Sequence, residues 1–405
     1  MTDSHANPGE RIALLERFSC LGPACPQTCC GGWTMQVDKP HLELYGRAAP
    51  DLAADVETTE SGPSMRRDPE TGRCVRLADG WCGVHRRHGT AMLGDACHFY
   101  PRVTRTLGGG VLMAAAPSCP EVARLALASD DGFQPVPATF NRLPHDLREA
   151  APHGLDRDAA RSVVAAFDRL ATEPSTTPER ALARIVTIAR SLRWFPADTW
   201  PESLDFLVAS ADARLGAAEP DGDDDVRPLH VLVGLIKASR HRPGDRLIAT
   251  VEELQRALGV MVNWETLDVW GDPQVAEMRA DFAAFRADRA VDLAPVLRRW
   301  LRLQLALVAF PFAGQGSHPE ERATLLAVRF AITRLALAAH LRVTGHCEED
   351  GVVRVVQSLA RLLDHLAEPD LLLTYCHDAG WTREARLRGL LEPDAAAMAR
   401  AKQPA

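Results

Sequence analysis

Cysteine is concentrated in one part of this 405-residue chain: eight of its ten cysteines lie between residues 20 and 119. Four of them fall within residues 20–30, among glycines and prolines that rule out a long helix or strand there. Thiolates held this close repel one another unless a cation lies between them. The pattern predicts a loop wrapped around a metal ion or an iron–sulfur cluster.

The spacing of these cysteines narrows the choice of metal. No Cys-x2-Cys pair is present, so a routine zinc ribbon fits poorly, whereas a 4Fe–4S cluster takes four cysteines from a Gly/Pro-rich wrap. We therefore expect a 4Fe–4S cluster, with zinc as the alternative. Eight thiols allow two four-cysteine sites, or one cluster and several cysteines that bind nothing. The candidate ligands are Cys20, Cys25, Cys29, Cys30, Cys74, Cys82, Cys97 and Cys119.

The cellular compartment bears on whether these cysteines bind a metal or form disulfides. The first ten residues are polar and lack the apolar core of a signal peptide, and the longest apolar stretch, 303–312, is too short to span a bilayer. These features predict a cytoplasmic protein, where clustered cysteines bind metal more often than they form disulfides. A secreted disulfide domain is the alternative. The net charge of −8 predicts neither a nucleic-acid nor a membrane partner, and the oligomeric state stays open.

The amino-acid composition of the chain changes near residue 130. This change predicts a cysteine-cluster metal-binding module over 1–128 and a helical domain over 129–405. In the first part, Asp79-Gly80 is a strong turn signal between two cysteines, and Gly108 to Gly110 suggests a second hairpin. In the second part, apolar residues at helical spacing predict helices over 156–171, from Pro178 onward, and over 319–344. The expected fold class is mainly α: an irregular cysteine-rich metal-binding N-terminal module with short β-hairpins, followed by a multi-helix domain.

The cysteine motifs, taken together, resemble the flagellin lysine-N-methylase family, within the wider group of proteins that carry a zinc- or iron-chelating cysteine-cluster domain. The resemblance rests on Phe18-x-Cys20, Cys25-x-x-x-Cys29-Cys30-x-Gly-Trp33, Cys97-x-x-Tyr-Pro-Arg102 and Ser118-Cys-Pro-Glu-x-Ala-Arg124, and it continues into the helical half at 301–312 and 352–365. It implies a 4Fe–4S cluster, S-adenosylmethionine as methyl donor, and the lysine side chains of a protein, flagellin-like or another peptide, as substrate.

Methyl transfer to lysine needs a neutral amine aimed at the methyl sulfonium. Tyr100, Asp95 and Glu121 lie in the cysteine module and are the candidate catalytic residues, because a carboxylate or phenol can hold the amine or accept its proton. No familiar donor-binding signature is present: Gly108 to Gly110 lacks the context of a dinucleotide fold, and the radical Cys-x3-Cys-x2-Cys motif fails at Gly32. The donor-binding residues therefore stay unassigned.

Two other functions remain open from the residues alone. One is a non-catalytic metal-binding protein whose module orders a helical scaffold for a partner. The other is an iron–sulfur redox or tailoring enzyme acting on a small molecule or peptide. In either case Cys347 and Cys376, far from the cluster, are expected to be small buried apolar residues.

Overall fold

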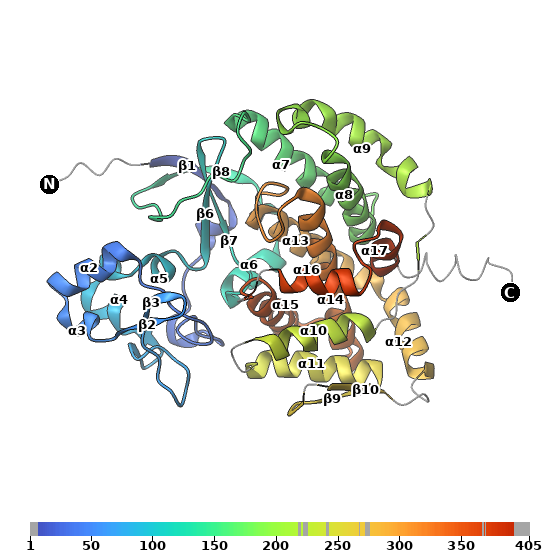
Figure 1. The fold of residues 1–405 in the computed structure, drawn as a ribbon. Helices are drawn as coiled ribbons and strands as arrows, with labels where there is room; N and C mark the ends of the chain where they lie inside the picture. Colours follow the sequence, from blue (N-terminus) through green and yellow to red (C-terminus); the bar gives the residue numbers. More distant parts are fainter. Residues whose placement is uncertain are drawn as a thin grey trace.

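The structure is a computed structural model that describes residues 7–217, 220–221, 226–239, 243–266, 268–271, 276–366, 368 and 370–392. It is 58% helical, with a few small sheets, so the predicted mainly α fold is confirmed. Figure 1 shows a smaller N-terminal part, in blue, beside a larger assembly of helices. A four-stranded sheet and the helix α6 (Pro120–Ala128) lie between the two.

The four-stranded sheet has the order β6-β7-β1-β8. Its first strand in the sequence, β1 (Asn7–Ile12), is an inner strand that pairs in parallel with β7 and antiparallel with β8. The other strands are β6 (Arg102–Leu107), β7 (Gly110–Ala115) and β8 (Pro135–Phe140). At Gly9 a β-carbon would lie 2.7 Å from both the Val111 carbonyl oxygen and the Phe140 ring, so this crowded inner position requires glycine.

The N-terminal part has its own small core beside this sheet. Met35, Tyr45 and Leu52 are buried in it, and the side chains of Cys74, Cys30 and Cys82 pack on or near them. The helices and strands around this core are α2 (Lys39–Ala48), α3 (Pro50–Ala53), β2 (Val56–Thr59), β3 (Gly62–Met65), β4 (Leu77–Ala78), β5 (Trp81–Cys82), α4 (Gly83–His88) and α5 (Asp95–Phe99). Both predicted hairpins form, the β4–β5 turn with positive φ at Asp79 and Gly80 and the β6–β7 turn at Gly108-Gly109.

The larger assembly is built around one long helix, α14 (Pro319–Thr344), whose side chains are buried from Ala323 to Leu341 with one exception. This helix is apolar and long enough to cross a membrane, but its apolar window is fully buried, as in the core helix of a globular domain. The helices that pack on it or on its neighbours are α7 (Arg157–Thr172), α8 (Pro178–Leu192), α9 (Trp200–Ala217), α10 (Val226–Ala238), α11 (Asp245–Leu258), α12 (Ala276–Asp288), α13 (Ala290–Leu307), α15 (Glu349–Leu363), α16 (Leu371–Asp378) and α17 (Glu384–Leu391).

The helices predicted over 156–171, from Pro178 and over 319–344 are confirmed by α7, α8 and α14. Several elements were not predicted: the strands β1 and β8, the hairpin β2–β3, the helix α16, and a second small hairpin made of β9 (Val260–Asn263) and β10 (Asp268–Gly271). The short helix α1 (Leu14–Arg17) follows β1 and leads into the first cysteines.

Candidate metal centre and adjoining pocket

Each of the eight cysteines of the N-terminal part lies near enough to another to affect its charge or be affected by it, and all ten cysteines are free thiols. The Cys74 backbone N–H donates to the Cys30 carbonyl oxygen at 2.7 Å, which fastens the β4 side of the module to the first cysteine loop. The Cys30 thiol also hydrogen-bonds to the sulfurs of Cys29 and Cys82. The hydrogen bonds from Cys30 lower the pKa of Cys82 to about 6 and that of Cys29 to about 7, and the same two contacts raise the pKa of Cys30 itself.

The electrostatic neighbours of each thiol divide the cysteines into two groups. The module group consists of Cys30, Cys74, Cys82 and Cys97: burial, and then Cys82 and Cys74, raise the pKa of Cys97 to about 12. The boundary group consists of Cys20, Cys25 and Cys119: burial and the neighbouring Cys25 thiol are among the causes that raise the pKa of Cys119 to about 12. Cys29 neighbours both groups.

The surroundings of these sulfurs suit metal ligands. Backbone N–H groups of Val84 and His85 donate to Cys82 at the start of α4, and those of Glu121 and Val122 donate to Cys119 at the start of α6. Such N–H···S bonds stabilise thiolates. Cys29 and Cys97 are exposed, so an incoming metal could reach them from solvent. These thiols have the chemistry that a metal or cluster requires, although among the described residues the donor atoms found within 4.8 Å of one another are those of Asp38, His41, Asp95 and His145 and include no sulfur.

One arginine ties the first cysteine loop to the helical part. The Arg361 side chain, from α15, donates to the carbonyl oxygens of Thr28, at 3.4 Å, and of Gly31. Its guanidinium also stacks on the Trp33 ring at 4.5 Å from the ring centre. The loop with four cysteines is therefore held directly by a helix more than three hundred residues later in the chain.

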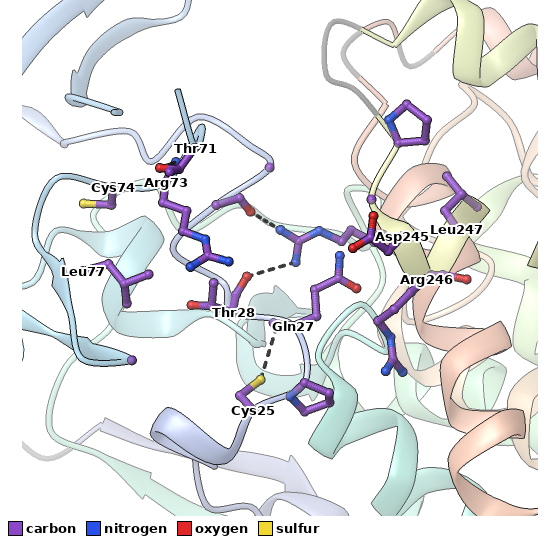
Figure 2. Close-up of a pocket in the computed structure, with 18 of the residues that line it drawn as sticks. Cys25, Gln27, Thr28, Thr71, Arg73, Cys74, Leu77, Asp245, Arg246 and Leu247 are labelled. Atoms are coloured by element: carbon purple, nitrogen blue, oxygen red, sulfur yellow. Dashed lines mark hydrogen bonds between the residues drawn. The ribbon is translucent and has the colours of Figure 1, made fainter. Parts of the chain in front are cut away.

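A pocket of ≈ 900 Å³ opens between this loop and the helical part. Figure 2 shows Cys25, Gln27 and Thr28 on one side of it and Arg246 on the other, with Arg73 reaching in from the β4 side. The start of α11 lines the pocket beside Arg246. The guanidiniums of Arg73, Arg246 and Arg361 line the pocket together with the carboxylates of Asp68, Asp79 and Asp245, so both an anionic and a cationic group of a ligand would find complementary charge there.

Behind the Arg361 side chain lies a buried polar chain that includes one of the sequence candidates. Ser118 is fully buried, and its hydroxyl lies 3.2 Å from the Tyr100 hydroxyl and 2.9 Å from Nε2 of His365. Its carbonyl oxygen accepts from the Gln357 side chain, whose own oxygen accepts from Arg246. This chain links Tyr100 to the wall of the pocket.

The electrostatics of this polar chain are defined. Burial, and then the Arg361 and Arg329 guanidiniums, lower the pKa of His365 to about 4, so the imidazole is neutral near pH 7. Burial raises the pKa of Tyr100 well above its usual value, so the phenol stays protonated. Trp33 packs against both rings, with ring centres 4.6 Å from Tyr100 and 4.7 Å from His365. The chain is therefore a set of neutral donors and acceptors.

The two acidic candidates lie apart from Tyr100 in different environments. The Glu121 carboxylate is buried and paired with the Arg124 side chain through two hydrogen bonds of 2.8 Å. The Asp95 carboxylate accepts from Arg142 at 2.6 Å and from the His145 backbone and ring. Both carboxylates are already occupied by partners within the protein.

Sequence reasoning missed Ser118, His365, Gln357 and Arg361 as members of the site. Ser118 and His365 lay inside stretches used for the family resemblance, but nothing in their local pattern signalled a contact across 247 positions. Of the two distant cysteines, Cys376 is buried as predicted. Cys347 is exposed, so its prediction was wrong, because it follows the end of α14 in a turn at the surface.

Three curated proteins are similar to this chain. A lysine-N-methylase of Salmonella typhimurium is 28% identical over 148 residues, and one of Salmonella choleraesuis is 27% identical over 147; each match covers 33% of this chain. The resemblance to the lysine-N-methylases is confirmed. The flagellar biosynthetic protein FliU of Salmonella muenchen is 28% identical over 132 residues, 30% of this chain and 78% of that protein.

The chain spans little more than a third, 37%, of the length of the two lysine-N-methylases that it matches. No family model matches the chain, and no solved structure matches it. The similarity to these lysine-N-methylases is thus confined to about a third of this chain.

Proposed function

We propose that this protein is a cytoplasmic iron–sulfur enzyme that transfers a methyl group from S-adenosylmethionine to lysine side chains of a protein. The similarity to lysine-N-methylases supports the reaction, and its relation to a flagellar protein supports flagellin as the first substrate to test. The observation that carries the proposal is the pocket of ≈ 900 Å³ that borders the first cysteine loop. A donor and a lysine side chain can meet there beside the thiols.

The boundary and module groups would hold the metal. Cys29 neighbours both groups, and counting it with the boundary group gives each group the four ligands that a 4Fe–4S cluster or a structural zinc requires. When bound, a cluster supplies a compact anionic centre and a redox couple, whereas zinc supplies a redox-inert anchor for the loop. Arg361 and the N–H groups at the start of α6 offset the negative charge of the boundary group.

The pocket would hold the methyl donor. The donor's carboxylate is complementary to the Arg246 and Arg73 guanidiniums, and its ammonium group to the Asp245 carboxylate at the start of α11. Arg246 is itself fixed, because its Nε donates to Gln357 at 2.9 Å. Gln357 would therefore act as a positioning residue that connects the donor site to Ser118.

Transfer requires the lysine to arrive as the free amine. The nitrogen lone pair then bonds to the methyl carbon, the carbon–sulfur bond breaks, and its electron pair stays on sulfur, which leaves a neutral thioether. The methylated ammonium afterwards releases a proton to solvent. Burial and the guanidiniums that keep His365 neutral would also lower the pKa of a lysine placed nearby, which favours the free amine. Tyr100 is the candidate that would hydrogen-bond to this amine.

The test is methyl transfer by protein purified without oxygen. It is incubated with flagellin and S-adenosylmethionine, and the lysines are analysed by mass spectrometry, with donor binding measured separately by calorimetry. We expect methyl groups on lysine, and a weaker donor affinity for Arg246→Ala but not for the surface variant Arg148→Ala. If the donor fails to bind to protein that retains its metal, the methyltransferase assignment is wrong. If the donor binds and flagellin stays unmodified, the substrate is another protein, and co-expressed candidates are screened in the same way.

A further inference from the structure

Four side chains outside the cysteine groups converge on one point. They are Asp38, His41, Asp95 and His145, and one donor atom of each lies within 4.8 Å of the donor atoms of the others. Asp38 and His41 come from the start of α2, Asp95 from the start of α5, and His145 from the segment after β8. Each ring Nδ1 atom lies close to a carboxylate oxygen. Nδ1 of His41 is 2.7 Å from Oδ1 of Asp38. Nδ1 of His145 is 2.9 Å from Oδ2 of Asp95 and 3.6 Å from Oδ1 of Asp38.

The remaining polar atoms of three of these side chains are held by other groups. The second oxygen of Asp38 accepts the Asp95 backbone N–H at 2.8 Å. The second oxygen of Asp95 accepts from Arg142 at 2.6 Å. Nε2 of His41 lies 3.3 Å from the Ala91 carbonyl oxygen. Outer contacts of this kind orient ligands in metal sites, where a histidine donates its second N–H to a carbonyl and ligating carboxylates are themselves hydrogen-bonded.

We propose that these four side chains form a binding site for a divalent first-row metal ion, separate from the cysteine groups. Two imidazole nitrogens and two carboxylate oxygens are a mixed set suited to zinc, iron(II) or manganese(II), and unlike the thiolates they are hard or borderline ligands. Ligands at ~2.1 Å from a tetrahedral ion are about 3.4 Å apart, so the two close pairs open by roughly half an ångström to admit it. The ion takes the place of a proton on each Nδ1, and each neutral imidazole then carries its proton on Nε2, which in His41 lies 3.3 Å from the Ala91 carbonyl oxygen.

The competing interpretation is a network of hydrogen bonds that caps helices. Asp38 does cap α2, since it accepts the His41 backbone N–H at 3.0 Å, and Arg142 brings a positive charge to Asp95. The two carboxylates still exceed this single guanidinium by one negative charge when both histidines are neutral. His145 is 42% exposed and gives the ion a path from solvent. Metal uptake separates the two interpretations.

The site would fasten three segments together. It joins the start of α2, the start of α5, which carries Cys97, and the segment after β8 that contains Arg142. A bound ion stabilises the folded protein in proportion to its concentration over its dissociation constant. The cysteine module would then be clamped to the four-stranded sheet by a metal that is chemically distinct from the one its thiols hold.

The experiment uses the full-length protein with its cysteine sites already loaded in the absence of oxygen. Manganese(II) is added, and the electron paramagnetic resonance signal of the free ion measures uptake, since thiolates select softer metals. We expect one manganese per chain in the wild type, and at least a tenfold rise in Kd for His145→Ala and for Asp95→Asn. The control is His346→Ala, a comparably exposed histidine paired with Glu348 in the helical part, which should match the wild type.

Two further measurements keep the result decisive. Iron content and circular dichroism establish that each variant is folded, and if Asp95→Asn fails to fold, the exposed His145→Ala decides alone. Thermal unfolding with manganese should shift upward for the wild type and not for His145→Ala. Equal uptake by the wild type and His145→Ala, or no uptake by the wild type at millimolar manganese, shows that the four side chains form a capping network without a metal.

Discussion

Replacing Arg361 by alanine should loosen the first cysteine loop from the helical part. The change removes the hydrogen bond to the Gly31 carbonyl oxygen, the longer one to Thr28 and the stacking on Trp33. A hydrogen bond from a charged donor contributes ~1.5–3 kcal/mol and a long one about 0.5 kcal/mol. Stacking of a cation on tryptophan adds ~0.5–2 kcal/mol. Because the pocket lets water reach the carbonyl oxygens, we expect a net loss of about 2–4 kcal/mol rather than the full sum.

The assay is denaturant unfolding of the metal-loaded protein without methyl donor, followed by tryptophan fluorescence and by the loss of metal–thiolate absorbance. Arg73→Ala is the matched control, since it removes an exposed guanidinium from the same pocket and should change stability by less than about 0.5 kcal/mol. Arg361→Lys should fall between the two, because it keeps the charge and lacks the planar fork. If Arg361→Ala unfolds at the same denaturant concentration as Arg73→Ala, the loop is held by other contacts and the reasoning is wrong.

Four shorter predictions concern the metal and the polar chain. Cys29→Ser should lose iron, as measured by elemental analysis. Cys376→Ser should keep its full iron content and lose ~1–3 kcal/mol of stability, because it buries a hydroxyl. Equal iron content in both variants would remove Cys29 from the ligand set. Ser118→Ala should lower methyl transfer while leaving donor affinity unchanged, and unaltered rates would separate the polar chain from the reaction. The pKa of His365 is lowered from 6.5 to about 4 in the folded protein, so the unfolded chain binds a proton there first as the pH falls. The free energy of unfolding therefore drops between pH 6.5 and 4. The Tm of His365→Gln should fall less between pH 7 and 5 than that of the wild type. Gln357→Leu should weaken donor binding by freeing Arg246, and wild-type affinity in calorimetry would exclude its positioning role.

Local chemistry was enough to predict much of the N-terminal part. Asp79-Gly80 takes the positive φ values that a two-residue hairpin requires, and Gly108-Gly109 does the same between β6 and β7. Each of these depends on neighbours a few positions away. The strand β1 escaped prediction because Asn7-Pro-Gly-Glu10 has low strand propensity, and its pairing with β7 and β8 overrides that preference.

The candidate site, too, could be predicted from the sequence only where the signal was local. The cysteine cluster was visible as a density of one residue type, and the structure brings these thiols together. Its division into groups was not visible, since Cys119 and Cys25 are 94 positions apart and become neighbours only in the folded chain. Tyr100 was singled out for its rarity, but the contacts that give it a neutral, buried partner come from Ser118 and from the end of α15. Asp95 was chosen as a proton acceptor, whereas its carboxylate is already bound by Arg142 and His145.

Because β1 is an inner strand, the sheet cannot assemble in the order in which its strands are synthesised. β1 is made first, yet the strands on either side of it end at residues 115 and 140. All eight clustered cysteines, the last at position 119, have therefore left the ribosome before the sheet can be completed by β8. A nascent chain can gather its thiols around a metal while the edge of β1 that pairs with β8 is still free. A chain without residues 7–12 would keep every candidate ligand, but it would expose the edges of β7 and β8 to other chains.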